Sequence, residues 1–179
     1  SYTSSYLTQT AFNGMPKGSS NQKIAGLEIV MSTGTSINLD SLIFTNTGTA
    51  NFSTNVSNMR CFYTGNSSAF ATTTQYASTL TTVSGGEIRF GQSMAILPGT
   101  NYFWLTYDIK TSATTDDSID ATIARVRIAG STYTPSPTTV TGKRYVIPNY
   151  CDVSSKYYNS YNYGITNVSL GAINNTTNT

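Results

Sequence analysis

The sequence predicts an all-β fold: an antiparallel β-sandwich, immunoglobulin-like in general architecture, followed by an extended C-terminal tail. Three observations point to it. Ser, Thr and Asn contribute about 70 of the 179 residues, whereas charged residues make up 10%. Thr, Tyr and Phe suit a half-buried pleated surface, and Asn, Ser and Gly suit turns. Short apolar runs recur between turn residues, and the long runs of Ala, Leu, Glu and Lys typical of helices are absent.

The first predicted strand, residues 24–31, alternates between its two faces. One face consists of Ala25, Leu27, Ile29 and Met31. Two shorter runs, 59–63 and 87–90, follow the same rule. Their inward residues are Met59, Cys61 and Tyr63 in the first run and Ile88 and Phe90 in the second.

Two further predicted strands change phase partway along. Residues 37–44 switch the face of their apolar side chains near 40–41, and residues 119–128 switch after Ile123. Because strand side chains alternate strictly, such a switch requires an irregularity in the strand. The sequence therefore predicts a β-bulge or bend in each of these strands.

The stretch 97–110, LPGTNYFWLTYDIK, is predicted to be the central strand, because one of its faces is almost wholly apolar. That face consists of Phe103, Leu105, Tyr107 and Ile109. The opposite face begins with Tyr102 and Trp104 and ends with charged residues. Two interpretations of these two rings are open. Either they form a platform on which a sugar ring stacks, or a loop or the chain's own tail covers them, which is favoured because aromatic side chains supply core area first.

The composition changes after residue 147. Residues 1–147 are predicted to form the sandwich module, with Pro148 at the boundary. Residues 148–179 are rich in Tyr and Asn and nearly uncharged. We interpret them as a linker and the truncated start of a second β-module.

The charge and hydropathy of the chain argue against two classes of binding partner, nucleic acid and the membrane interior. A net charge of +2 without a run of basic residues argues against nucleic acid. No apolar segment approaches the roughly 20 residues that a membrane-spanning helix needs. A chain rich in Thr, Asn and Tyr and poor in charge is typical of secreted proteins. The expected location is therefore extracellular.

Enzymatic activity is not expected from this chain. It contains no His, which excludes the Ser-His-Asp and Cys-His mechanisms and nearly all zinc sites. Cleavage by paired carboxylates needs only two acidic residues. Most of the acidic residues look like isolated surface positions. They are Glu28, Asp40, Glu87, Asp108, Asp116, Asp117, Asp120 and Asp152.

One acidic cluster, formed by Asp116, Asp117 and Asp120, falls within TTDDSID (114–120). Together with nearby carbonyl groups, these carboxylates could hold Ca²⁺, which prefers clustered oxygen ligands. The alternative is a solvated turn between two strands, and the spacing matches no calcium-binding repeat. No other cofactor is expected.

Cys61 and Cys151 are the two cysteines of the chain. In an oxidising compartment they could form a disulfide that closes a long loop and stabilises the fold. The alternative is a buried free thiol at Cys61 and a Cys151 whose partner lies elsewhere. One pair of cysteines does not decide between these.

Five blocks occur in an order that resembles a known module. They are GSSNQKIAGLEIV (18–30), LDSLIFTNTGT (39–49), NMRCFYTGNSSAFATTTQY (58–76), LPGTNYFWLTYDIK (97–110) and SIDATIARVRIAGSTYTP (118–135). Together they resemble the N-terminal β-domain of BNR-repeat neuraminidases, over roughly residues 6–147. The resemblance implies a module repeated in large secreted and cell-surface bacterial proteins exported by the type IX route. Residues 150–177 resemble the start of a domain named for a Gly-Glu-Val-Glu-Asp motif, although the motif itself is absent.

The resemblance does not carry over a catalytic residue. Sialidases use an arginine triad, a Tyr nucleophile and repeats of the pattern Ser-x-Asp-x-Gly-x-Thr-Trp, whereas the single Trp104 lies in GTNYFW. It implies a structural or adhesive module of a surface adhesin or filament, with neighbouring modules of the same protein as partners. The alternative is a carbohydrate-binding accessory domain of a secreted hydrolase, with surface glycans as partners and Tyr102 and Trp104 as the stacking pair.

Overall fold

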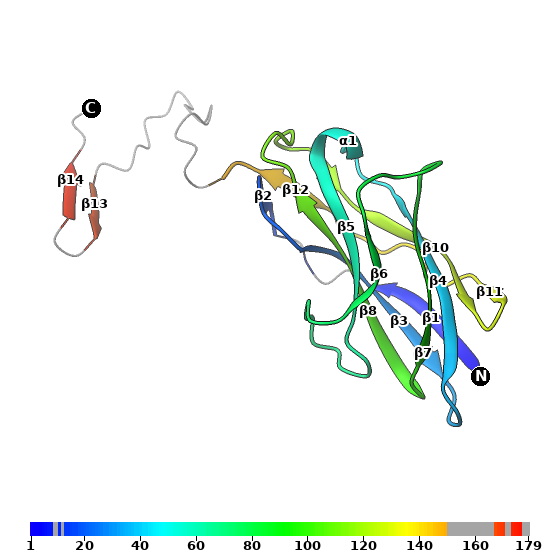
Figure 1. The fold of residues 1–179 in the computed structure, drawn as a ribbon. Coiled ribbons are helices and arrows are strands. Elements are labelled where there is room, and N and C mark those ends of the chain that lie inside the picture. Colours follow the sequence, from blue (N-terminus) through cyan, green and yellow to red (C-terminus); the bar gives the residue numbers. More distant parts are fainter. Residues whose placement is uncertain (9–10, 12, 150–166, 171–172, 177–179) are drawn as a thin grey trace. The chain divides into compact units, whose positions relative to one another are not determined.

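The computed structural model describes residues 1–8, 11, 13–149, 167–170 and 173–176 (Figure 1). The chain divides into two compact units, Ser1–Asn149 and Tyr150–Thr179. The first unit is a sandwich of antiparallel sheets, as the composition predicted. None of the helices among the described residues is long and apolar enough to cross a membrane.

The larger sheet has five strands in the order β1-β3-β8-β5-β6. Their bounds are β1 Tyr2–Thr8, β3 Gln22–Met31, β8 Gly99–Ile109, β5 Val56–Tyr63 and β6 Gln75–Leu80. All neighbouring pairs are antiparallel. The stretch around Trp104 is therefore the central strand of this sheet, as predicted (Figure 1).

The second sheet has four strands in the order β11-β10-β4-β7. Their bounds are β11 Ser131–Tyr133, β10 Ala121–Ile128, β4 Ile37–Asn46 and β7 Glu87–Ile96. Side chains from the two sheets form one hydrophobic core. The predicted inward residues of β8 all belong to it, because Phe103, Leu105, Tyr107 and Ile109 are 0–2% exposed.

Both predicted irregularities are present. The pairing of β4 with β7 shifts between Leu39 and Ser41, which are the positions flanking the phase change. The pairing of β10 with β4 shifts between Ile123 and Arg125. Each shift lets the apolar side chains on both sides of it reach the same core.

A small third sheet joins distant parts of the first unit. Strand β12 (Arg144–Ile147) pairs in parallel with β2 (Met15–Pro16) and antiparallel with β9 (Ser118–Ile119). The short helix α1 (Phe52–Asn55) begins at Asn51, whose side chain accepts a hydrogen bond from the backbone N–H of Ser53. Strands of two residues carry no periodicity, so the sequence did not reveal this sheet.

The second unit contains an antiparallel strand pair, β13 (Asn167–Leu170) and β14 (Ile173–Thr176). The division after Asn149 lies two residues beyond the boundary predicted from composition. That this unit is the truncated start of a second module stays a prediction.

Candidate functional site

The outer face of the five-stranded sheet carries the residues that the sequence singled out. Strand β8 alternates between the core and this face, and Trp104 is not part of the core cluster that contains Phe103 and Leu105. Even so, Trp104 is only 5% exposed. Its indole Nε1 donates a hydrogen bond to Thr64 Oγ1 at 2.9 Å. The loop after β5 therefore folds onto the ring.

Phe70, from the same loop, lies edge-on to Trp104, with 5.8 Å between ring centroids and 75° between planes. A loop therefore covers Trp104, as the second interpretation of the two rings expected. Tyr102 remains half-buried, and its ring is nearly parallel to that of Trp104, at 12° and 6.3 Å. Whether Tyr102 and Trp104 contact a ligand stays a prediction.

Gly26 allows Trp104 to lie close to the sheet. It is the register partner of Trp104 on the neighbouring strand β3. A Cβ atom at this position would lie 2.9 Å from Cζ3 of the indole ring and would also clash with Thr8 Oγ1. The space that a side chain would take is filled by the ring instead.

Lys23 places a cation over this group of rings. Its Nζ lies 5.2 Å from the centroid of Trp104 and 5.4 Å from that of Phe70, a separation at which an ammonium is attracted to the face of a ring. Burial lowers the pKa of Lys23, and the nearby Arg144 guanidinium lowers it further. Within the described residues the ion pairs are Arg60–Asp108 and Arg125–Glu87, so Lys23 has no carboxylate partner there.

Glu28 lies on the other side of the rings. It is the register partner of both Tyr6 and Tyr102. The Tyr6 hydroxyl donates to Glu28 Oε2 at 2.5 Å. This hydrogen bond is the main reason why the pKa of Tyr6 is raised to about 12, and burial of the hydroxyl group adds to the shift. We refer below to Lys23, Glu28, Phe70, Tyr102 and Trp104 together as the outer-face site.

The sequence analysis identified Tyr102 and Trp104 as site residues and missed the other three members of the outer-face site, Lys23, Glu28 and Phe70. Phe70 stands in a Ser/Thr-rich stretch, 64–82, that reads only as a loop. A single large apolar residue within a polar loop is the one signal that could have indicated a packing contact, but this signal does not identify the residue that Phe70 packs against.

Asp108 continues β8 beyond the rings and is held by a polar network. Its Oδ1 accepts from Arg60 Nη1 and from the backbone N–H of Asn21, and its Oδ2 accepts from Asn58 Nδ2, each at 2.8 Å. Burial alone would raise the pKa of Asp108, but these hydrogen bonds outweigh it and lower the pKa. Asp108 therefore stays ionised and structurally engaged.

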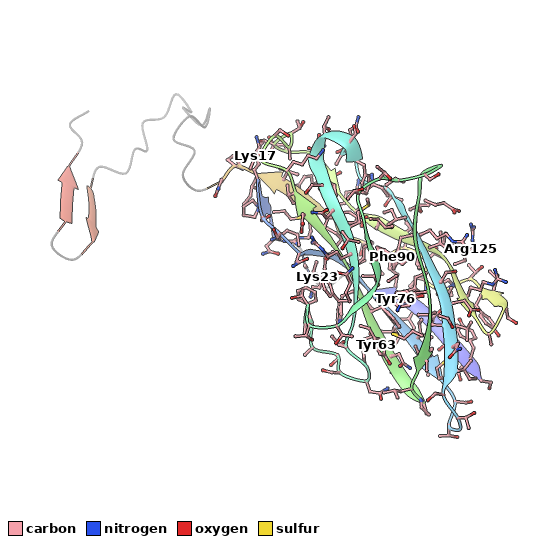
Figure 2. All side chains as sticks on the ribbon, in the orientation of Figure 1. Lys17, Lys23, Tyr63, Tyr76, Phe90 and Arg125 are labelled. Carbon is pink, nitrogen blue, oxygen red and sulfur yellow. The ribbon has the colours of Figure 1, made fainter. Side chains whose placement is uncertain are left out.

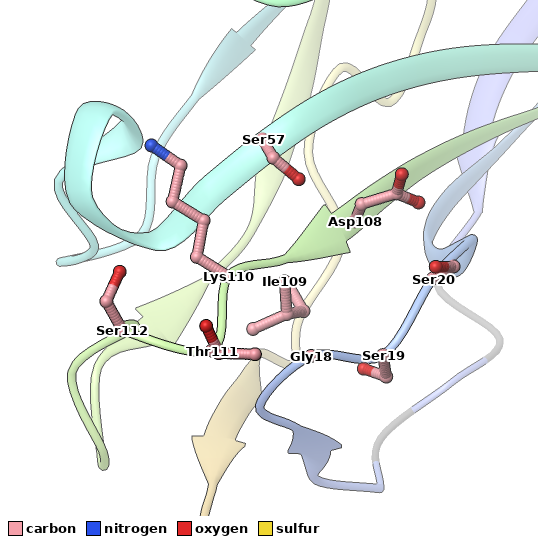
Figure 3. A pocket seen from close by; sticks show the side chains of 9 residues that line it. All are labelled: Gly18, Ser19, Ser20, Ser57, Asp108, Ile109, Lys110, Thr111 and Ser112. Atoms are coloured by element: carbon pink, nitrogen blue, oxygen red, sulfur yellow. The ribbon is translucent and has the colours of Figure 1, made fainter.

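A polar recess of about 370 Å³ opens beside Asp108 at the end of β8 (Figure 3). Ser20, Ser57 and Thr111 contribute hydroxyl groups to its lining. Lys110 also lines it, but its Nζ donates to the Ser53 carbonyl oxygen of α1 at 2.6 Å. In a chain so rich in Ser and Thr, a hydroxyl-lined hollow alone does not indicate a ligand.

The predicted calcium ligands are engaged separately. Asp117 Oδ2 accepts from Asn55 Nδ2 at 2.9 Å, and Asp120 Oδ1 accepts from the backbone N–H of Ala121 at 2.8 Å. Asp116 occupies a turn with φ of 69°. No group of three or more acidic, Cys or His residues that could hold a metal is found in the part of the chain that the structure describes. The calcium site stays a prediction without a supporting observation.

Cys61 is fully buried and has no disulfide partner among the described residues, and burial raises the pKa of its thiol. Cys151 lies outside the described residues, so the predicted disulfide stays untested.

The carboxylates that catalysis would need are likewise distributed among structural partners. Asp40 Oδ2 accepts from the backbone N–H of Gly130, and Glu87 pairs with Arg125 at 2.7 Å. Glu28, Asp108, Asp117 and Asp120 are engaged as described above. Asp152 lies outside the described residues.

The family of the chain follows from comparison with known proteins. A family model described as the N-terminal domain of BNR-repeat neuraminidase matches residues 14–132, which is more than half of the chain. The chain belongs to this family. The match covers the five-stranded sheet except β1, the four-stranded sheet as far as Thr132, and the whole outer-face site.

A solved structure supports the fold of this family member. The structure titled "Hadza microbial sialidase Hz136" matches 79% of the chain with a TM-score of 0.60 and 11% sequence identity. At that identity the likeness concerns the fold alone. The match spans 31% of the length of that sialidase. No protein with a curated description matches the chain.

Proposed function

We propose that this chain is a non-catalytic, carbohydrate-binding accessory module of a larger secreted or cell-surface protein. The observation that carries the proposal is the outer-face site. Phe70, at 38% exposed, and the half-buried Tyr102 surround Trp104 on the face that does not supply the core. Tyr102 stands on β8, and Phe70 is held by its contact with Trp104. Rings whose positions are already fixed can contact the apolar face of a sugar without loss of much conformational entropy. The role of Trp104 is to support these rings rather than to meet the sugar.

The absence of catalysis is supported by the distribution of the described carboxylates. Glycoside hydrolysis needs two carboxyl groups facing one substrate, about 5–10 Å apart. Here Glu28, Glu87 and Asp108 each have a different structural partner. The match to a domain named as the N-terminal part of a neuraminidase fits a role beside a catalytic domain rather than as one.

Two assays of the full chain test the proposal. Incubation with a panel of chromogenic glycosides, sialosides included, is expected to release no product. An array of immobilised glycans is expected to show binding that decreases in Phe70→Ala. Turnover of any glycoside, or a complete lack of glycan binding, would contradict the proposal.

A structural or adhesive role is the second candidate, and strand β12 favours it. This strand carries the chain out of the first unit and is hydrogen-bonded on both sides, to β2 and to β9. Arg144 at its start is 3% exposed and binds the segment around Asn13. A module fixed in this way suits a chain of modules under tension. Neighbouring modules as partners, an extracellular location and export by the type IX route remain proposals.

A further inference from the structure

Lys23 is the feature of the outer-face site that a neutral sugar does not explain. Along β3, Lys23 is the register partner of Thr106, Gly26 of Trp104, and Glu28 of Tyr102. The backbone positions of Lys23 and Glu28 therefore lie roughly 15 Å apart at the rise of a strand, and the Lys23 ammonium reaches over the Trp104 ring. The rings between them, with 5.8 Å from Phe70 to Trp104 and 6.3 Å from Trp104 to Tyr102, suit more than one linked sugar ring.

Among the described residues, no carboxylate forms an ion pair with Lys23 or Arg144. Arg144, the cation that acts on it, is itself bound to neutral acceptors: the carbonyl oxygens of Asn13 and Lys23 and the side-chain oxygen of Gln22, at 2.7–2.9 Å. Arg60 lies beyond Thr106 in the same row but is neutralised by Asp108 at 2.8 Å. Two partly desolvated cations, Lys23 and Arg144, with no ion-pair partner in the described part of the chain favour the approach of a negative group.

The aromatic rings beside Lys23 indicate which kind of ligand carries the negative group. The Lys23 ammonium is held by cation–π contacts with Phe70 and Trp104 rather than by an ion pair. A ligand carboxylate bound by this ammonium would lie beside the exposed Phe70 ring. At the other end, Glu28 accepts one hydrogen bond from Tyr6 and has oxygen lone pairs left for further donors.

From this arrangement we propose that the outer-face site binds an acidic carbohydrate, with Lys23 on its carboxylate, Phe70 and Tyr102 against its ring faces, and Glu28 on its hydroxyl groups. The inference rests on the carbohydrate-binding function proposed above and specifies its ligand. Glu28 favours a glycan over an acidic peptide, because sugar hydroxyls donate to a carboxylate whereas a second peptide carboxylate would be repelled.

Calorimetric titration of the full chain with a short oligogalacturonate tests the charge requirement. The fully methyl-esterified oligomer is the matched neutral probe, since it keeps the rings and removes the carboxylates. We expect the acidic oligomer to bind at least tenfold more tightly, as a charge-assisted hydrogen bond contributes that much. Lys23→Gln should weaken binding of the acidic oligomer about tenfold and leave binding of the ester unchanged.

Lys17 provides the control for Lys23. It lies near β2, at a different place on the sandwich, and Lys17→Gln removes the same charge (Figure 2). We expect it to change the affinity less than about twofold. Phe70→Ala should weaken binding of both oligomers, by roughly three- to tenfold, whereas Tyr145→Ala, which removes another exposed ring, should have no effect. Circular dichroism melts of each variant verify that it is folded.

The outcomes separate this inference from the function on which it rests. Equal affinity for the acidic oligomer and its ester, or an equal loss in Lys17→Gln and Lys23→Gln, overturns the acidic ligand but leaves a carbohydrate-binding module. Lys23-dependent binding of polyglutamate as tight as that of oligogalacturonate overturns the glycan in favour of an acidic peptide. Failure to bind either oligomer or any glycan of the array removes both proposals.

Discussion

At the scale of single residues, Gly26 decides whether Trp104 can lie against the sheet. Gly26→Ala forces the indole or β1 to move, because the new methyl group would overlap Thr8 Oγ1 and the indole ring. We expect a loss of about 1–3 kcal/mol in the free energy of unfolding, as is usual for overpacking. Since Trp104 is the only Trp, its fluorescence emission should shift to longer wavelength as the ring becomes exposed.

Gly91→Ala is the matched control for this prediction. Gly91 also stands in a strand, β7, but a Cβ there would meet nothing within 4 Å. Its free energy of unfolding in urea should change by less than about 0.5 kcal/mol, and its emission should be that of the wild type. An unchanged spectrum and stability in Gly26→Ala would mean that the space beside Trp104 is not filled as described.

The residues that the sequence identified and those that it missed differ in how they are placed. Phe103 and Leu105 are predictable as core because alternation along one strand determines their face. Trp104 is predictable as a residue of the opposite face for the same reason. Lys23 and Phe70 reach it from another strand and from a loop, and such long-range contacts leave no periodic signal in the sequence.

At the scale of elements, the sequence predicted the long strands and missed the short ones. The phase changes in 37–44 and 119–128 predicted real irregularities, because eight to ten alternating residues establish a phase that can be broken. Strands β2, β9 and β12 have two to four residues and establish none. Their sheet is held together in part by one buried side chain, that of Arg144.

Arg144→Met should therefore destabilise the first unit strongly. The guanidinium donates to the carbonyl oxygens of Asn13, Gly14 and Lys23 and to Gln22 Oε1. Methionine fills much of the same volume but donates nothing, so these acceptors lose their partner. We expect a loss of about 3 kcal/mol or more in the free energy of unfolding, measured by urea denaturation.

Arg127→Met tests whether the effect of Arg144→Met comes from burial rather than from loss of charge. Arg127 is exposed on β10, and its removal should cost less than about 0.5 kcal/mol. Similar losses in the two variants would show that the hydrogen bonds of Arg144 contribute little.

At the scale of the whole molecule, the question is whether the first unit depends on the residues that follow it. Every member of the described hydrophobic core lies between Leu7 and Val146. The last strand of the unit, β12, is paired on both sides within it. These observations predict that a chain ending at Asn149 folds on its own.

A chain truncated after Asn149 should accordingly melt within about 2 °C of the full chain and have the same association state in solution. A chain truncated after Gly142 is the informative comparison, because it loses β12 and with it Arg144 and Val146. It should unfold or melt far lower. If truncation after Asn149 lowers the melting temperature or changes the association state, residues 150–179 contribute to the stability or assembly of the sandwich, as a strand added to one of its edges would.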